Sequence, residues 1–177
     1  MNNSLVPIIV PATITDYNTV QNMARFYVYD RTEFMRWECP ENGMFECIDF
    51  KHYFVDNDKK AFLIKVENEL AGFILLDKEC LLTKEIDWNI GEFFILAKFQ
   101  GKGVALKVIE LIFKMYSGKW SVAVMPENIK ALKFWRKAII LAAGNKFTEI
   151  FKTEKELKTS DNPDPYAMNI FTFEIVI

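Results

Sequence analysis

The fold is decided by the stretch Gly91-Glu-Phe-Phe-Ile-Leu-Ala-Lys-Phe-Gln-Gly-Lys-Gly-Val-Ala-Leu-Lys107. It begins as an apolar run typical of a buried strand, passes through a turn with two glycines, and continues as an amphipathic segment typical of a helix. The first four N–H groups of a helix have no partner within the helix and lie at the positive end of its dipole. The stretch therefore predicts a phosphate-binding turn, and a nucleotide-type cofactor is the first hypothesis.

Two common phosphate-binding patterns do not match this turn. The Gly-x-Gly-x-x-Gly pattern fails because Leu106 stands where the third glycine belongs, and no Gly-Lys-Ser/Thr closes a Walker loop. The pattern that does match is Gln100-x-x-Gly103-x-Ala105, which resembles the pyrophosphate loop of the GNAT (Gcn5-related) N-acetyltransferases. A second segment, Asn128-x-x-Ala131-x-x-Phe134-Trp135, resembles the one that follows the fifth strand of that family.

The order of the expected elements extends this resemblance over nearly the whole chain. Hydrophobic patterning predicts strands at residues 5–10, 61–67, 71–77, 88–96, 120–124, 147–152 and 168–176. Helices are expected from Thr15 or Asp16 onward and at residues 48–54, 103–117 and 128–142. This βααβββαβαββ order is that of the α/β GNAT fold, a mixed central sheet of about seven strands flanked by about four helices. We expect one domain over residues 1–177.

The resemblance implies acetyl-CoA as the cofactor and direct transfer of its acetyl group to a primary amine in a ternary complex. The pyrophosphate would lie on the loop formed by Gln100, Gly101, Lys102, Gly103, Val104, Ala105 and Leu106. The backbone of Phe94, Ile95 and Leu96 would pair with the pantetheine arm, and Asn128 would contact the cofactor. Each feature also has a purely structural interpretation: a turn without a ligand, a core strand, and an ordinary helix N-cap.

The catalytic groups depart from the pattern of the family. Trp135 stands where the family commonly has a tyrosine that protonates the leaving thiolate, and an indole N–H cannot do this. Ala123 stands where some members carry a glutamate base. Water or Tyr166 then remains as the proton donor. Glu92 is the best remaining base, because a carboxylate in an otherwise apolar strand is partly desolvated. A strand-end glutamate paired with a lysine is the alternative, and we expect the lone His52 to have a packing role.

The segment between residues 30 and 49 is acidic and is expected to form the acceptor site. An acidic rim attracts a cationic amine, and the aromatic side chains there would add a wall, whereas the alternative is a solvated helix face. The acids are Asp30, Glu33, Glu38, Glu41, Glu46 and Asp49, and the aromatics are Tyr27, Tyr29, Phe34 and Trp37. We therefore expect the acceptor to be a small cationic molecule, and the sequence leaves open a polyamine, an aminoglycoside-like compound, an amino acid or a protein terminus.

Composition limits the remaining function classes. The chain is 51% hydrophobic with a net charge of −2, which argues against a disordered chain and against general nucleic-acid binding. Three cysteines, without a CxxC pair, favour a reducing, cytoplasmic setting, and no apolar run is long enough to span a membrane. We expect a small-molecule amine as partner, with a homodimer left open. The alternative to an active enzyme is a catalytically weak CoA-binding or interaction module that retains the fold.

Overall fold

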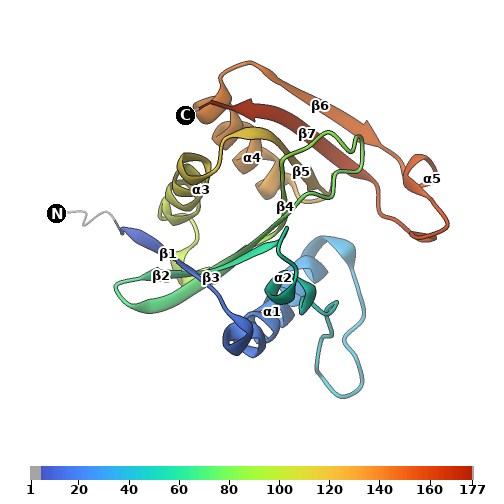
Figure 1. Cartoon of the computed structure of the whole chain (residues 1–177). Coiled ribbons are helices and arrows are strands. Elements are labelled where there is room, and N and C mark those ends of the chain that lie inside the picture. Colours follow the sequence, from blue (N-terminus) through green and yellow to red (C-terminus); the bar gives the residue numbers. More distant parts are fainter. Residues whose placement is uncertain (1–4, 177) are drawn as a thin grey trace. The chain divides into compact units, whose positions relative to one another are not determined.

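The computed structural model describes residues 5–176 (Figure 1). The strands are β1 (Pro7–Pro11), β2 (Lys60–Val66), β3 (Glu69–Asp77), β4 (Trp88–Ile95), β5 (Gly118–Val124), β6 (Phe147–Lys152) and β7 (Met168–Ile175). The α-helices are α1 (Tyr17–Met35), α2 (His52–Val55), α3 (Val104–Met115), α4 (Ile129–Ala143) and α5 (Glu154–Leu157), and two short 3-10 helices are η1 (Ile14–Asp16) and η2 (Ala97–Phe99).

The strands form one seven-stranded sheet in the order β1-β2-β3-β4-β5-β7-β6. β4 pairs in parallel with β5, whereas the pairs β1–β2, β2–β3, β5–β7 and β6–β7 are antiparallel, so the sheet is mixed as expected. The chain packs into two compact units, which we call the first unit (residues 5–77 and 92–108) and the second unit (residues 78–91 and 109–176). A single domain over residues 1–177 stays a prediction.

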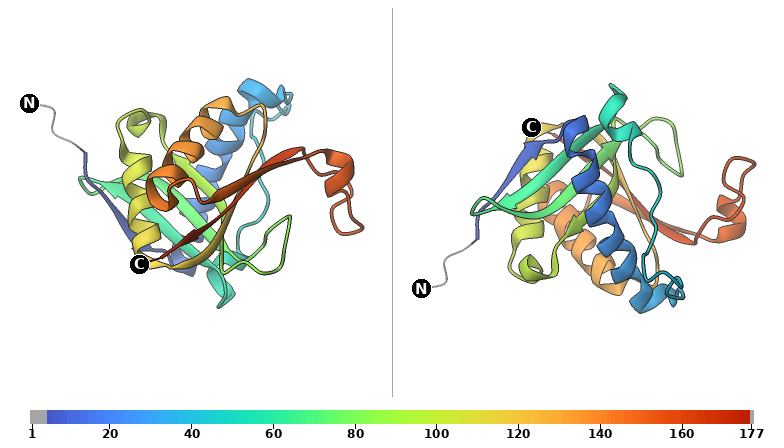
Figure 2. Two further views of the ribbon diagram at one scale, coloured as in Figure 1. Left: turned by 90° about the horizontal axis from the view of Figure 1, so that it is seen from above. Right: turned by 90° about the horizontal axis from the view of Figure 1, so that it is seen from below.

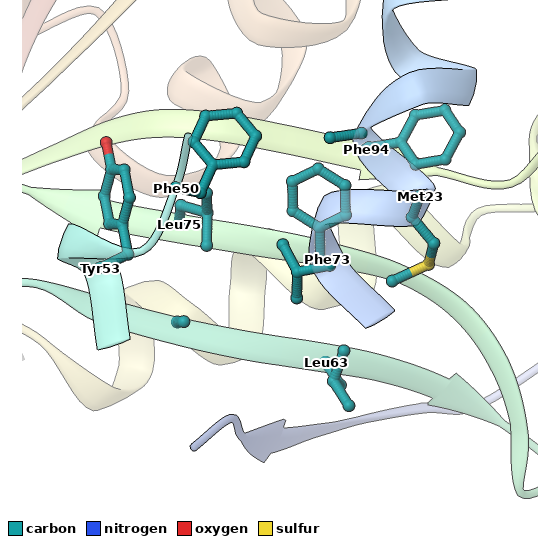
Figure 3. Close-up of a cluster of buried hydrophobic side chains, with 10 residues drawn as sticks. Met23, Phe50, Tyr53, Leu63, Phe73, Leu75 and Phe94 are labelled. Atoms are coloured by element: carbon teal, nitrogen blue, oxygen red, sulfur yellow. The ribbon is translucent and has the colours of Figure 1, made fainter. Parts of the chain in front are cut away.

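In the first unit, α1 and α2 cover the strands β2 and β3 (Figure 2). The hairpin between these strands turns at Glu67 and Asn68, whose φ angles of 51° and 66° are those of a tight hairpin turn. Side chains from the two helices and from β2, β3 and β4 meet in a buried cluster (Figure 3). Its members are Val20, Met23, Ala24, Phe50, Tyr53, Ala61, Leu63, Phe73, Leu75 and Phe94.

β3 and β4 approach each other closely at Gly72. A Cβ atom added to Gly72 would lie 2.0 Å from the carbonyl oxygen of Phe94, which is far inside van der Waals contact. Only glycine therefore allows β4 to take its place beside β3. The position of Phe94 matters because the candidate base Glu92 lies two residues earlier on the same strand.

The second unit is built around β5, β7 and β6. Figure 1 shows β6 and β7 as a long hairpin with α5 near its far end. The ring of Phe113 on α3 lies 5.0 Å from the ring of Trp120 on β5 and 5.4 Å from that of Phe173 on β7. These edge-to-face contacts hold this part of α3 on the two strands.

Most predicted elements lie within a few residues of the observed ones, but two differ. The expected helix at residues 48–54 is reduced to α2, because side chains bind the backbone N–H groups that precede it. Phe50 N donates to the Gln21 side chain, and Lys51 N donates to Asp49. The short helix α5 was not predicted, although Thr153 and Glu156 form a capping box at its start. Within the described part of the chain, no helix is long and apolar enough to cross a bilayer.

Candidate functional site

The turn before α3 has the geometry of an anion-binding loop. Gly101 and Gly103 have φ angles of +70° and +80°, which favour glycine strongly, and a Cβ added to either would meet nothing within 4 Å. The helical hydrogen bonds begin with Lys107 N, which donates to Gly103 O at 3.2 Å. Among the described residues, the N–H groups from Gly101 to Leu106 donate to no backbone carbonyl. A row of unused donors beside open space is therefore available for a phosphate.

The predicted pantetheine-binding backbone of β4 is only partly free. The N–H of Leu96 donates to Ala71 O at 2.8 Å, so this group faces β3. The carbonyl of Phe94 faces β3 as well, since it is the atom that a side chain on Gly72 would meet. Groups of Ile95 point the other way because successive residues of a strand alternate. Its carbonyl accepts a 2.7 Å hydrogen bond from Gln100 Nε2, which leaves the N–H of Ile95 as the candidate donor of the three.

Glu92 lies on β4 of the first unit with its carboxyl group largely withdrawn from water. The Tyr27 hydroxyl, on α1, donates a hydrogen bond to it. Burial, with a smaller contribution from the nearby Asp77 carboxylate, raises the pKa of Glu92 to about 7, although Arg31 and the Tyr27 hydroxyl act to lower it. The residue as a whole is partly exposed, although its carboxyl group is buried. Such a carboxyl group exchanges protons near neutral pH, as a general base must.

The partners of Glu92 come from one face of α1. Tyr27 and Arg31 are four residues apart, so they lie on the same side of the helix. The guanidinium of Arg31 lies 5.4 Å from the centre of the Tyr27 ring and 5.1 Å from that of Trp37. On its other side, the Tyr27 ring is 5.9 Å from the ring of Phe94. From the sequence, Tyr27 was expected in an aromatic wall, and Arg31 was not predicted as a partner of Glu92. The spacing of four residues between Tyr27 and Arg31 on one helix could have indicated that they lie together.

A second carboxylate adds to the negative charge around Glu92. Asp77, at the end of β3, is buried and accepts a hydrogen bond from the hydroxyl of Tyr53. It was not singled out from the sequence, because an aspartate after a buried strand usually reads as the first residue of a loop. The site thus has two acidic groups of different environments on neighbouring strands.

In the second unit, Asn128 is the N-cap of α4. Its side-chain oxygen accepts a 3.0 Å hydrogen bond from Ala131 N, which confirms the structural interpretation. Its side-chain NH₂ group has no partner among the described residues, so the cap does not prevent a cofactor contact. Trp135 is buried on the same helix, with its ring 5.0 Å from that of Phe134.

The structure also places the remaining candidates from the sequence. His52 starts α2 and stacks on Tyr53, with the ring centres 4.5 Å apart, in agreement with a packing role. All six acids between residues 30 and 49 are exposed. Tyr166 is 42% exposed in the connection before β7. The three cysteines are free thiols.

Comparison with known proteins agrees with this geometry. The family model described as Acetyltransferase (GNAT) family matches residues 23–139. An acetyltransferase from Thermus thermophilus has a similar structure, with a TM-score of 0.64, 15% identity and coverage of 97% of this chain and 99% of that chain. A spermidine N-acetyltransferase from Vibrio cholerae, in complex with CoA and spermine, has a TM-score of 0.63 and 15% identity over 96% of this chain and 95% of that one. No curated protein shows significant sequence similarity to the chain.

At such low identity the solved structures establish the fold, whereas the family match, which covers well over half of the chain, establishes the relationship. The loop of free amides before α3 fits both findings, and so does the order of the elements, which is βααβββαβαββ apart from the added short helix α5. The chain therefore belongs to the GNAT family and is an acetyl-CoA-dependent N-acetyltransferase.

Proposed function

We propose that this enzyme acetylates the primary amine of a small cationic molecule by direct transfer in a ternary complex, with Glu92 as the general base. The observation that carries the proposal is the environment of Glu92. Its carboxyl group is withdrawn from water on β4, held by the Tyr27 hydroxyl, and has a pKa raised by burial to about 7. At neutral pH about half of such groups are ionised and ready to accept a proton.

The proposed reaction requires Glu92 to accept one proton from the acceptor. Acetyl-CoA supplies the acetyl group as a thioester, so that attack of the amine nitrogen on the carbonyl carbon forms an amide and releases CoA as a thiol. The acceptor reaches the site mainly as an ammonium ion, which must lose a proton before its nitrogen can attack. The ionised Glu92 carboxylate takes that proton, directly or through a water molecule, while the Tyr27 hydroxyl fixes the orientation of the carboxylate.

The chain also offers groups that fit the cofactor. The free N–H groups of the loop from Gly101 to Leu106 suit the pyrophosphate, and Lys102 adds a positive charge. The N–H of Ile95, on the side of β4 away from β3, suits an amide carbonyl of the pantetheine arm, and the side-chain NH₂ group of Asn128 suits a further contact.

The exposed acids between residues 30 and 49 support an acceptor that arrives as a cation. Together they would raise the local concentration of an ammonium ion, an effect that salt weakens. We propose water as the proton donor for the leaving thiolate, because Trp135 cannot supply a proton. The free cysteines support a reducing compartment such as the cytoplasm. A homodimer remains a prediction, for which the edge position of β6 is the relevant feature.

The proposal is tested by thiol release from acetyl-CoA in the presence of a panel of primary amines. Glu92→Gln keeps the shape of the side chain and removes its basicity, so we expect turnover at pH 7 to fall on the order of a hundredfold. The stabilisation of the protein by acetyl-CoA should persist in this variant. A loss of less than about threefold at saturating amine would show that Glu92 has only a structural role.

A further inference from the structure

One arginine of the first unit lacks the partners that its charge requires. Arg25 is half-buried on α1, and its Nε atom is buried with no hydrogen-bond partner among the described residues. Its Nη1 atom donates to the thioether sulfur of Met44, which is a weak acceptor. No carboxylate of the described chain pairs with it, although six acids lie within the following 24 residues.

The hydrogen bonds of Gln21 contrast with those of Arg25, which lies one turn later on the same face of α1. Both ends of the Gln21 side-chain amide have hydrogen-bond partners. Its Nε2 atom donates to Ile48 O at 2.9 Å, and its oxygen accepts from Phe50 N at 3.2 Å. The segment from residue 44 to residue 50 therefore satisfies the polar groups of Gln21 and offers Arg25 only the thioether sulfur of Met44. A half-buried guanidinium with an unused donor is costly unless an anion completes it.

Arg25 also belongs to the neighbourhood of Glu92. The thiol of Cys47 lies within the electrostatic reach of both groups: burial raises its pKa, Arg25 lowers it, and Glu92 raises it. The Met44 side chain that contacts Arg25 is 49% exposed and has flexible torsions, so a ligand can displace it. An anion at Arg25 would then be bound in the first unit, which also contains Glu92.

We propose that Arg25 binds a carboxylate of the acceptor, so that the acceptor carries a carboxylate besides its amines and keeps a net positive charge, as a diamino acid does. This inference rests on the proposed function and specifies its substrate class. The exposed acids attract the ammonium end of such a molecule, and the arginine fixes its other end by a two-pronged contact that a lysine could not make. A polyamine, with cationic groups alone, offers Arg25 no partner.

The experiment compares amines in matched pairs that differ only by a carboxylate, such as a diamino acid and the diamine with the same chain, with spermidine as a polycation. For the unmodified protein, we expect kcat/KM to be at least tenfold higher for the carboxylated member of a pair, since one charge-assisted hydrogen bond is typically sufficient for that. Arg25→Gln should remove this preference, because it lowers kcat/KM at least tenfold more for the carboxylated amine than for the plain amine. Arg36→Gln is the matched control, because Arg36 is an exposed arginine directly after α1. This variant should keep the preference for the carboxylated amine.

Met44→Leu gives a second test that does not remove the charge. Leucine cannot accept a hydrogen bond, so the carboxylate no longer competes with a thioether and should bind more tightly. Equal kcat/KM within the pairs for the unmodified protein, or an equal loss for both members in Arg25→Gln, would overturn the proposal. Should Arg25→Gln fail to fold, a Met44→Leu variant with unchanged or weaker affinity would overturn it as well.

The proposal can fail separately from the proposed function. Stabilisation by acetyl-CoA is measured first and does not depend on Arg25. If acetyl-CoA binds and no amine of the panel is acetylated, the proposed acceptor chemistry is wrong. Calorimetric binding of the carboxylated amine in the presence of CoA then still tests Arg25, and only binding that Arg25→Gln weakens at least tenfold supports the site.

Discussion

The environment of Glu92 has a consequence for stability that can be measured without knowing the acceptor. Burial raises the pKa of this carboxyl group to about 7, from an ordinary value of 4.5. Between these two pH values the folded protein holds a proton that the unfolded chain has lost, so the free energy of unfolding falls as the pH rises from about 4.5 to about 7. Above pH 7 the folded protein contains an ionised carboxylate in a poorly solvated place.

The size of this effect follows from the shift. A displacement from 4.5 to about 7 corresponds to at most about 3 kcal/mol of unfolding free energy, and about 2 kcal/mol remains after allowance for the partial exposure of Glu92. A glutamine side chain has no proton to lose, so Glu92→Gln removes the contribution of this group to the pH dependence of the unfolding free energy. Relative to the unmodified protein, we therefore expect the variant to gain about 2 kcal/mol of stability between pH 4.5 and pH 8.

Urea unfolding of both proteins at several pH values between 4.5 and 8 measures this difference. Any constant cost of losing the Tyr27 and Arg31 interactions cancels, because only the change with pH is compared. Glu156→Gln is the control: hydrogen bonds from the backbone of Thr153 and from Lys152 lower the pKa of Glu156 to about 2, so its contribution is constant above pH 5. A stability difference between Glu92→Gln and the unmodified protein that does not change with pH would refute the reasoning.

Three further predictions concern glycine and tryptophan positions. Gly103→Glu should abolish the thermal stabilisation by acetyl-CoA, whereas Gly103→Ala should retain most of it. Both variants carry the same cost of about 1–2 kcal/mol for the positive φ of this position. Equal stabilisation of the two variants by acetyl-CoA would place the pyrophosphate elsewhere. Gly72→Ala should lower the free energy of unfolding by about 3 kcal/mol or more in urea titrations, because its Cβ would lie 2.0 Å from Phe94 O, and a loss below about 1 kcal/mol would contradict this. Trp135→Tyr should cost about 1–2 kcal/mol of stability and leave the acetyl-transfer rate unchanged, since Trp135 is buried; a faster rate would place the residue beside the cofactor thiol.

The local sequence is enough to predict the order of the elements, apart from α5, and the geometry of the loop before α3. Both are local: the strand before the loop is a continuous apolar run, and the loop needs two residues with positive φ, which Gly101 and Gly103 provide. The N-cap at Asn128 is equally local, because asparagine favours that position strongly. The short helix α5 could have been predicted from the Thr153 and Glu156 spacing.

Only the tertiary structure decided what surrounds Glu92 and Arg25. The partners of Glu92 are Tyr27 and Arg31, more than 60 residues earlier in the chain, and no local pattern connects a strand residue with a helix face that far away. Burial and the charge of neighbours set the pKa of Glu92, and both depend on how α1 packs on β3 and β4. For Arg25 the sequence shows six acids nearby, and the fold leaves all of them exposed and none of them paired with it. Charge in a sequence is a matter of composition, whereas pairing requires donor and acceptor atoms within hydrogen-bond distance, which only packing brings about.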